Sequence, residues 1–156
     1  MPFVDRFRGP QAGAIRGDFV IQKRAGLPAY QLAVVVDDAA QGVTEVLRGD
    51  DLIPSTPRQL LLYRALGLAP PAFCHVPLVV GPDGLRLAKR HGDTSLAAFR
   101  ARGVAAERIV GWLGATLGFC PPGVERTPRD LLPAFDLDRV PRAPVDGTTA
   151  DFFART

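Results

Sequence analysis

The sequence predicts an α/β fold in which parallel strands are covered by helices, followed by a small all-helical region. Segments with strand-like and helix-like spacing alternate through the first half of the chain, and this order is typical of a parallel sheet with helical crossovers. Beyond about residue 93 the apolar spacing is helical only. We therefore predict two parts, residues 1–92 and residues 93–156.

Extended structure is predicted for the beginning of the chain. Residues 1–17 show no clean apolar period and are expected to form an edge strand or an extended lead-in. Residues 18–24 (DFVIQKR) alternate in polarity, which favours a strand. For residues 29–42 (AYQLAVVVDDAAQG), the sequence is ambiguous between a strand and a helix. The valine run favours a strand, whereas the length and the closing Gly42 favour a helix.

A strand and a helix follow. Residues 43–47 (VTEVL) alternate cleanly and run into a charged turn at residues 48–51. Thr56 is predicted to be the N-cap of the next helix, with Gln59 three residues later completing a capping box. Residues 75–80 (HVPLVV) then predict a buried strand.

Three short helices are predicted in the second part. The first covers residues 95–102, and the second covers residues 105–117, whose apolar side chains recur on one face. The third begins at Thr127, with Asp130 placed to complete its cap. The last 18 residues are expected to trail along the surface.

Composition and charge limit the classes of function. Hydrophobic residues make up 47% of the chain and charged residues 22%, as in ordinary globular proteins. The longest aliphatic run, residues 32–36, is far below the ~20 residues of a membrane span, and residues 1–10 lack the apolar core of a signal peptide. A cytoplasmic protein without a membrane partner is therefore expected. A net charge of +3 permits contact with nucleic acid without requiring it.

Charged segments follow two of the predicted strands, at residues 48–51 and 86–91. Ligands of parallel α/β sheets bind beyond the carboxyl ends of the strands, so a site is expected there. The second segment lies in LRLAKRHG (residues 85–92), a basic stretch that holds Lys89, one of two lysines among 19 basic residues. Cations on such a loop suit the charge that develops on a triphosphate. The alternative is an ordinary solvated turn.

Two longer strings resemble a known family. RLAKRHGDTSL (residues 86–96) resembles the KMSKS-type signature of glutamyl-specific class I aminoacyl-tRNA synthetases, and residues 29–67 resemble the same family over almost their whole length. The resemblance is strongest to the truncated branch of glutamyl-Q tRNA(Asp) synthetases, in which the run YQLAVVVDDA is typical. It covers roughly residues 3–150 and implies a helix at residues 29–40.

The resemblance implies a reaction and a set of site residues. Glutamate would be activated by ATP with Mg²⁺ and then passed to the queuosine base of tRNA(Asp). Tyr30 and Arg48 would line the glutamate site, and Asp51 would lie beside the adenosine part of ATP. Lys89 would contact the ATP phosphates, with Arg86 at the first basic position of the signature.

The sequence also departs from the family pattern. The family carries a HIGH-type motif near its N-terminus and zinc-binding cysteines between the two halves of its catalytic domain, and His75 and His91, the two histidines here, fit neither. Ala88 stands where the signature usually has Ser, and Arg86 where it has Lys. We therefore expect the C-terminal half of a Rossmann-type catalytic domain with a helical stem-contact region, and no zinc or other metal site.

Two other functions stay open. The chain could be a non-catalytic fragment, or a split half that binds tRNA or a partner chain carrying the HIGH half. It could also be a fragment of a glutamyl-tRNA synthetase, which the short C-terminal part disfavours. Several residues have simpler structural interpretations as packed, capping or scaffolding residues: Asp37, Asp38, Cys74, His75, His91, Trp112 and Cys120.

Overall fold

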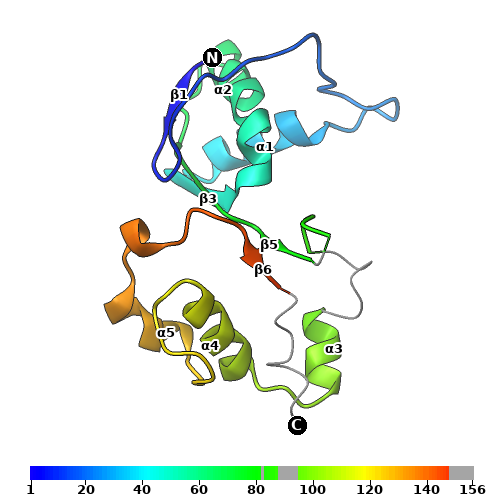
Figure 1. The fold of residues 1–156 in the computed structure, drawn as a ribbon. Coiled ribbons are helices and arrows are strands. Elements are labelled where there is room, and N and C mark those ends of the chain that lie inside the picture. The colour runs from blue at the N-terminus through cyan, green and yellow to red at the C-terminus, as the bar shows by residue number, and fades with distance from the viewer. Residues whose placement is uncertain (82, 88–94, 148–156) are drawn as a thin grey trace. The chain divides into compact units, whose positions relative to one another are not determined.

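The computed structural model describes residues 1–81, 83–87 and 95–147 (Figure 1). The chain divides into two compact units, residues 1–76 and residues 77–156. This division lies earlier than the boundary after residue 92 that the sequence predicts. The reason is that a short strand at Val79–Val80 pairs with Val145–Asp146 and so ties this stretch to the later part of the chain.

The first unit contains a parallel strand pair flanked by helical crossover segments. Its elements are β1 (Phe3–Asp5), β2 (Gly9–Gln11), α1 (Tyr30–Ala40), β3 (Glu45–Gly49), the 3₁₀ helix η1 (Asp50–Ser55), α2 (Thr56–Ala65) and β4 (Ala72–Val76). β1 and β2 form an antiparallel hairpin, while β3 and β4 run parallel with Arg48 opposite His75. The backbone N–H of Arg6 donates to the carbonyl of Phe73 (2.9 Å), which holds the hairpin beside β4.

Tertiary packing decides the ambiguous valine segment. Residues 30–40 form helix α1, as the family resemblance implies and against the strand propensity of valine. Val35 is fully buried and packs with Leu62 and Tyr63 of α2 in the core of this unit. A buried apolar face stabilises a helix more than intrinsic propensity opposes it.

Three expectations for the first unit are wrong. Residues 18–24 form no strand and make only an isolated bridge between Gln22 and Pro28, because the alternating side chains find no neighbouring strand. Residues 75–80 do not form one strand: His75 and Val76 end β4 (Ala72–Val76), and Val79–Val80 form the separate strand β5. The capping box at Thr56 is absent as well: α2 continues from η1, its N-cap is Ser55, and no side chain caps it.

The second unit is mainly helical, as predicted. It contains β5 (Val79–Val80), α3 (Leu96–Ala101), α4 (Ala106–Thr116), α5 (Pro128–Leu131), the 3₁₀ helices η3 (Leu132–Ala134) and η4 (Leu137–Arg139), and β6 (Val145–Asp146). Ser95 caps α3, and Thr127 and Asp130 form a complete capping box on α5. The expectation of a trailing end is wrong for residues 145–146, since they form β6, whereas residues 148–156 lie outside the described part.

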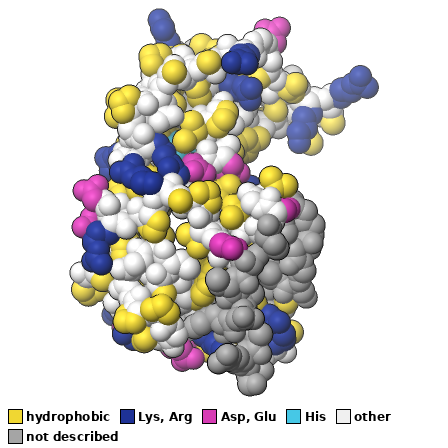
Figure 2. Space-filling model, in the orientation of Figure 1, with side chains coloured by type: hydrophobic (Ala, Val, Ile, Leu, Met, Phe, Trp, Pro, Cys, Tyr) yellow, Lys and Arg dark blue, Asp and Glu magenta, His cyan; other side chains and the backbone are white. Residues whose placement is uncertain are grey.

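The surface of both units includes exposed hydrophobic side chains (Figure 2). In the second unit, apolar residues of α4 and α5 line a hollow around Leu113, Leu117, Phe119 and Phe135. Trp112 is half-buried, and of the two cysteines Cys74 is buried and Cys120 partly buried. Among the residues that the structure describes, no helix is long and apolar enough to cross a membrane.

Candidate functional site

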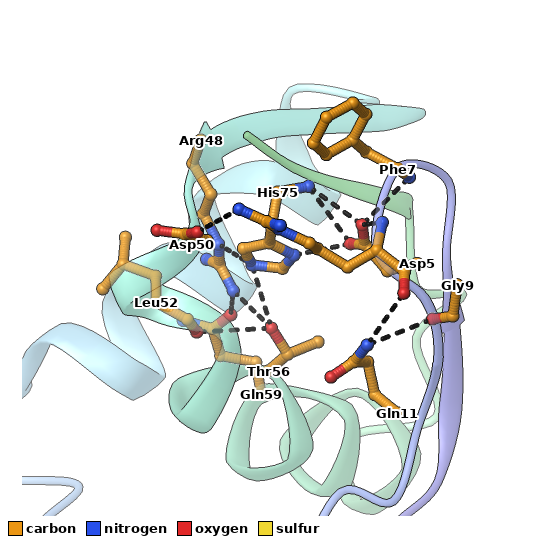
Figure 3. Close-up of polar contacts among 11 residues, drawn as sticks. Asp5, Phe7, Gly9, Gln11, Arg48, Asp50, Leu52, Thr56, Gln59 and His75 are labelled. Carbon is orange, nitrogen blue, oxygen red and sulfur yellow. Dashed lines mark hydrogen bonds and ion pairs between the residues drawn. The ribbon is translucent and has the colours of Figure 1, made fainter. Parts of the chain in front are cut away.

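A cluster of buried polar side chains lies at the carboxyl end of β3 (Figure 3). Asp5 ends β1, His75 lies on β4, and Thr56 and Gln59 belong to the first turn of α2. These four residues are at most 1% exposed. Arg48 of β3 lies among them, on the strand beside His75. Buried polar groups are costly unless they are paired, so the hydrogen bonds of this cluster need a full account.

Asp5 is held by the backbone. Its carboxylate accepts hydrogen bonds from the N–H groups of Phe7 (3.0 Å), Arg8 (2.7 Å) and His75 (3.1 Å). It also pairs with Nδ1 of the His75 ring at 2.6 Å. Burial alone would raise the pKa of Asp5, but the hydrogen bonds from Arg8, His75 and Phe7 outweigh burial and lower it. The carboxylate therefore stays ionised in the folded protein.

The contacts of His75 specify its tautomer. Nε of Arg48 lies 2.9 Å from Nε2 of His75, and a guanidinium can only donate. Nε2 must therefore be the acceptor, which leaves the proton on Nδ1, where Asp5 accepts it. Burial, together with the charge of Arg48, lowers the pKa of His75 although Asp5 opposes this. The imidazole is thus a neutral link between a carboxylate and a guanidinium.

A second set of contacts holds the other side of the guanidinium. Nη2 of Arg48 donates to Oγ1 of Thr56 and to Oε1 of Gln59, both at 2.8 Å. Nε2 of Gln59 then donates to Oε1 of Gln31 (3.0 Å), whose own amide donates to Ser55 (3.1 Å). The side chains of Thr56 and Gln59 therefore accept hydrogen bonds from Arg48, which explains why they form no capping box.

Arg48 keeps one nitrogen, Nη1, that His75, Thr56 and Gln59 do not occupy. The guanidinium carbon also lies 5.1 Å from the ring centre of Phe73, a cation–π distance. Burial lowers the pKa of Arg48, and Tyr30, Asp38 and Asp5 partly restore it. Tyr30, at the start of α1, is 51% exposed. The arrangement offers a fixed cation beside an accessible phenol, which suits a carboxylate ligand.

The sequence-predicted residues fall into three groups. Tyr30 and Arg48 lie near each other in the first unit, and Asp51 is an exposed residue of η1 directly after β3. Arg86 is an exposed residue of the second unit, bridged to Val80. Lys89 and His91 lie outside the described residues. Within the described ranges, no group of three or more His, Cys, Asp and Glu side chains could hold a metal ion.

Sequence reasoning missed most of the partners of Arg48. The sequence places Asp5 in an extended lead-in, gives no role to Gln31 and predicts that Gln59 caps a helix. His75 was expected to be a packed residue of a strand, which is confirmed, but its two hydrogen-bond partners were not foreseen. One signal was available: an arginine at the end of a predicted strand that is partly buried in the fold needs acceptors nearby. Asp50, two residues after Arg48, pairs instead with Arg8 at 2.5 Å.

Comparisons with known proteins show the family of the chain. Residues 8–127 match the family described as tRNA synthetases class I (E and Q), catalytic domain. A glutamyl-Q tRNA(Asp) synthetase of Symbiobacterium thermophilum is 56% identical over 146 residues, which cover 92% of this chain and 45% of the relative. A glutamate–tRNA ligase of Heliobacterium modesticaldum is 43% identical over 159 residues, which cover 90% of this chain and 32% of the relative.

A solved structure is similar as well. The crystal structure of a glutamate tRNA ligase from Elizabethkingia meningosepticum, in complex with its amino acid, superposes with a TM-score of 0.74 at 28% identity. The similarity covers 98% of this chain and 35% of that chain. The chain therefore spans less than half the length of each of these three proteins.

Proposed function

The chain belongs to the class I tRNA synthetases for glutamate and glutamine, and from this premise we propose that it supplies the glutamate-binding part of a ligase that activates glutamate with ATP. The family match and the similar structure confirm both the resemblance and the α/β fold class inferred from the sequence. The observation that carries the proposal is the guanidinium of Arg48, which His75, Thr56 and Gln59 hold in place beside Tyr30.

Arg48 and Tyr30 are proposed to hold the side-chain carboxylate of glutamate. A guanidinium is a planar donor that fits a carboxylate, and it stays charged at any working pH. Arg48 is already ordered by three side chains, so little rotamer entropy remains to be lost on binding. The phenol of Tyr30 can donate a further hydrogen bond to the same carboxylate or orient it.

The residues proposed to bind ATP are Asp51, Arg86 and Lys89. Asp51 follows β3 on the same 3₁₀ helix as Asp50, and an aspartate there would accept a hydrogen bond from the ribose or adenosine. Arg86 and Lys89 are proposed to face the phosphates, with Mg²⁺ bound to ATP as part of the substrate. Cations aimed at the leaving pyrophosphate stabilise the charge that develops as it departs. No zinc site is part of the proposal.

The acceptor of the activated glutamate is proposed to be the queuosine base of tRNA(Asp), in the cytoplasm. Four glutamyl-Q tRNA(Asp) synthetases are 47–56% identical to this chain, against 42–46% for four glutamate–tRNA ligases. Transfer to the 3′ end of a glutamate tRNA is the related alternative. Binding of tRNA or of a partner chain without catalysis is the other candidate function.

Glutamate-dependent exchange of pyrophosphate into ATP tests the proposal. The assay is run on the 156-residue chain alone and with the N-terminal half of the catalytic domain of the Symbiobacterium relative added as a separate polypeptide. We expect no exchange by the chain alone and measurable exchange by the mixture. Lys89→Ala should lower kcat of the mixture by about 10²–10³. A mixture that binds tRNA but exchanges no pyrophosphate would favour the binding function instead.

A further inference from the structure

The Asp5–His75 pair is buried too deeply for either side chain to contact a substrate. Both side chains are at most 1% exposed. Beyond the backbone, Asp5 is bonded to His75, and His75 is bonded in turn to Arg48 and, more weakly, to Thr56 (3.3 Å). Replacing a buried ionisable pair by apolar residues is often neutral or stabilising, so packing alone does not require these groups.

The direction of every hydrogen bond in the pair is determined. Backbone N–H groups can only donate, so these contacts alone make the Asp5 carboxylate an acceptor, whatever the state of the imidazole. Asp5 then selects the tautomer with the proton on Nδ1. That tautomer presents the lone pair of Nε2 to Nε of Arg48. The opposite tautomer would place two N–H groups against each other at 2.9 Å.

The pair therefore orients the guanidinium of Arg48. Nε is held from one side by His75, and Nη2 from another by Thr56 and Gln59. With two of its three nitrogens fixed, the plane of the guanidinium is fixed, and so is the direction of Nη1. Either oxygen of a carboxylate can accept from such a donor, whereas a glutamine side chain can offer only its amide oxygen and brings an NH₂ group that the guanidinium cannot satisfy.

We propose that Asp5 and His75 are positioning residues that fix the tautomer facing Arg48 and thereby set the preference of the site for glutamate over glutamine. This inference rests on the proposed glutamate site and adds to it the residues that determine its selectivity. Neither side chain touches the amino acid in this scheme. Their effect reaches the ligand through the orientation of one guanidinium.

Two substitutions of His75 separate positioning from packing. The amide oxygen of His75→Gln can take the place of Nε2 and accept from Arg48. The shorter His75→Asn can donate to Asp5 from the place of Nδ1 but does not reach Arg48. Glu45→Gln is the matched control, because Glu45 lies on β3 in an exposed ion pair with Arg6.

Affinities for glutamate and glutamine are measured by calorimetry on the 156-residue chain and its variants. His75→Asn should lower the glutamate-to-glutamine ratio by about 10-fold, mostly through weaker glutamate binding. His75→Gln should recover most of the ratio, and Glu45→Gln should leave it unchanged. If the wild-type chain prefers glutamate and His75→Asn keeps that preference, the positioning role is wrong while the glutamate site stands. If the wild-type chain shows no preference, the glutamate site and the inference fall together.

A measurement on the unmodified protein covers the case in which a variant does not fold. The chain has two histidines, so the ¹⁵N resonances of the His75 ring are those that remain in His91→Gln. We expect the chemical shifts of a neutral ring protonated at Nδ1 at pH 7. A ring protonated at Nε2, or at both nitrogens, would overturn the proposal without reference to any ligand.

Discussion

Two threonines of this chain are followed by similar local sequences but form different structures. Thr56 is followed three residues later by Gln59, and Thr127 by Asp130. At Thr127 the capping box forms, with Oδ2 of Asp130 accepting from the Thr127 backbone N–H (2.8 Å). At Thr56 it does not form, and both side chains bind Arg48. Local capping rules therefore decide the geometry only where no buried charge competes.

Burial explains which interaction is favoured. Asp130 and its cap lie at the surface, where water can replace any lost hydrogen bond at small cost. Thr56 and Gln59 are at most 1% exposed, beside a guanidinium that is itself partly buried. An unsatisfied charged donor there would cost more than an uncapped helix end, and the Thr56 backbone N–H already donates to the carbonyl of Ile53 in η1.

Removing the charge should give the largest effect. Arg48→Ala is expected to cost on the order of 2–4 kcal/mol in kcat/KM for glutamate in the reconstituted exchange assay, because a charge-assisted contact to the carboxylate is lost. The KM for ATP should change little. Arg129→Ala, an exposed arginine of α5 next to the other threonine, serves as the control. An equal loss in ATP use would show that Arg48 does not contact the amino acid.

The two threonines themselves should differ in stability. Thr56→Val leaves a buried donor of Arg48 without one acceptor and should cost about 1–3 kcal/mol of unfolding free energy. Thr127→Val removes a surface cap and should cost about 1 kcal/mol or less. Urea unfolding can follow each unit separately, since both tyrosines, Tyr30 and Tyr63, lie in the first unit and the single tryptophan, Trp112, in the second.

Each substitution should destabilise its own unit. Thr56→Val is expected to shift the tyrosine-detected transition and Thr127→Val the tryptophan-detected one. The interpretation of the Thr56 site as the costlier of the two would be refuted by equal or reversed losses of unfolding free energy.

Acid should weaken the buried cluster in two stages. The pKa of His75 is lowered from 6.5, mainly by burial and further by Arg48, while Asp5 and Asp50 act in the opposite direction. The unfolded chain therefore binds the proton more readily, so stability is complete above pH 6.5 and declines as the pH falls below it. The pKa of Asp5 is lowered from 3.8, so a second loss follows below pH 3.8.

Urea midpoints detected by tyrosine fluorescence between pH 8 and pH 3 test this expectation. His75→Gln should remove the first decline and keep the second. A midpoint that rises between pH 7 and pH 5 would mean that His75 is protonated beside Asp5 in the folded protein.

The comparison of the two threonines also shows what the sequence could predict. The cap at Thr127 was predictable because its partner, Asp130, lies three residues away. The helix at Tyr30–Ala40 was ambiguous from propensity and was resolved only by the family resemblance. Tyr30 and Arg48 were found in the same way, from matching motifs.

The rest of the cluster depends on contacts that no local pattern encodes. Asp5 and His75 are 70 residues apart, Gln59 and Gln31 are 28 apart, and Arg48 and His75 are 27 apart. Their proximity follows from the register of β3 with β4 and from the hairpin beside β4. A capping rule considers only three or four consecutive residues and therefore predicts that Gln59 caps a helix. It cannot include the competing guanidinium, because Arg48 lies on another element.

The smallest effect is expected at the surface cap of α5. Hydrogen bonds from the backbone and side chain of Thr127, and the charge of Arg126, lower the pKa of Asp130 from 3.8 although slight desolvation opposes them. The support that Asp130 gives to the first turn is therefore present above pH 3.8 and is lost as the pH falls through its lowered pKa. The amide proton of Thr127, which donates to Asp130, should shift upfield in acid NMR spectra and exchange faster. The amide of Ala98 is the internal control, since it donates to the hydroxyl of Ser95, which does not titrate. A parallel change at both amides would point to general acid unfolding of the second unit. A Thr127 amide that keeps its shift below the pKa of Asp130 would mean that the capping box depends on the hydroxyl of Thr127 alone.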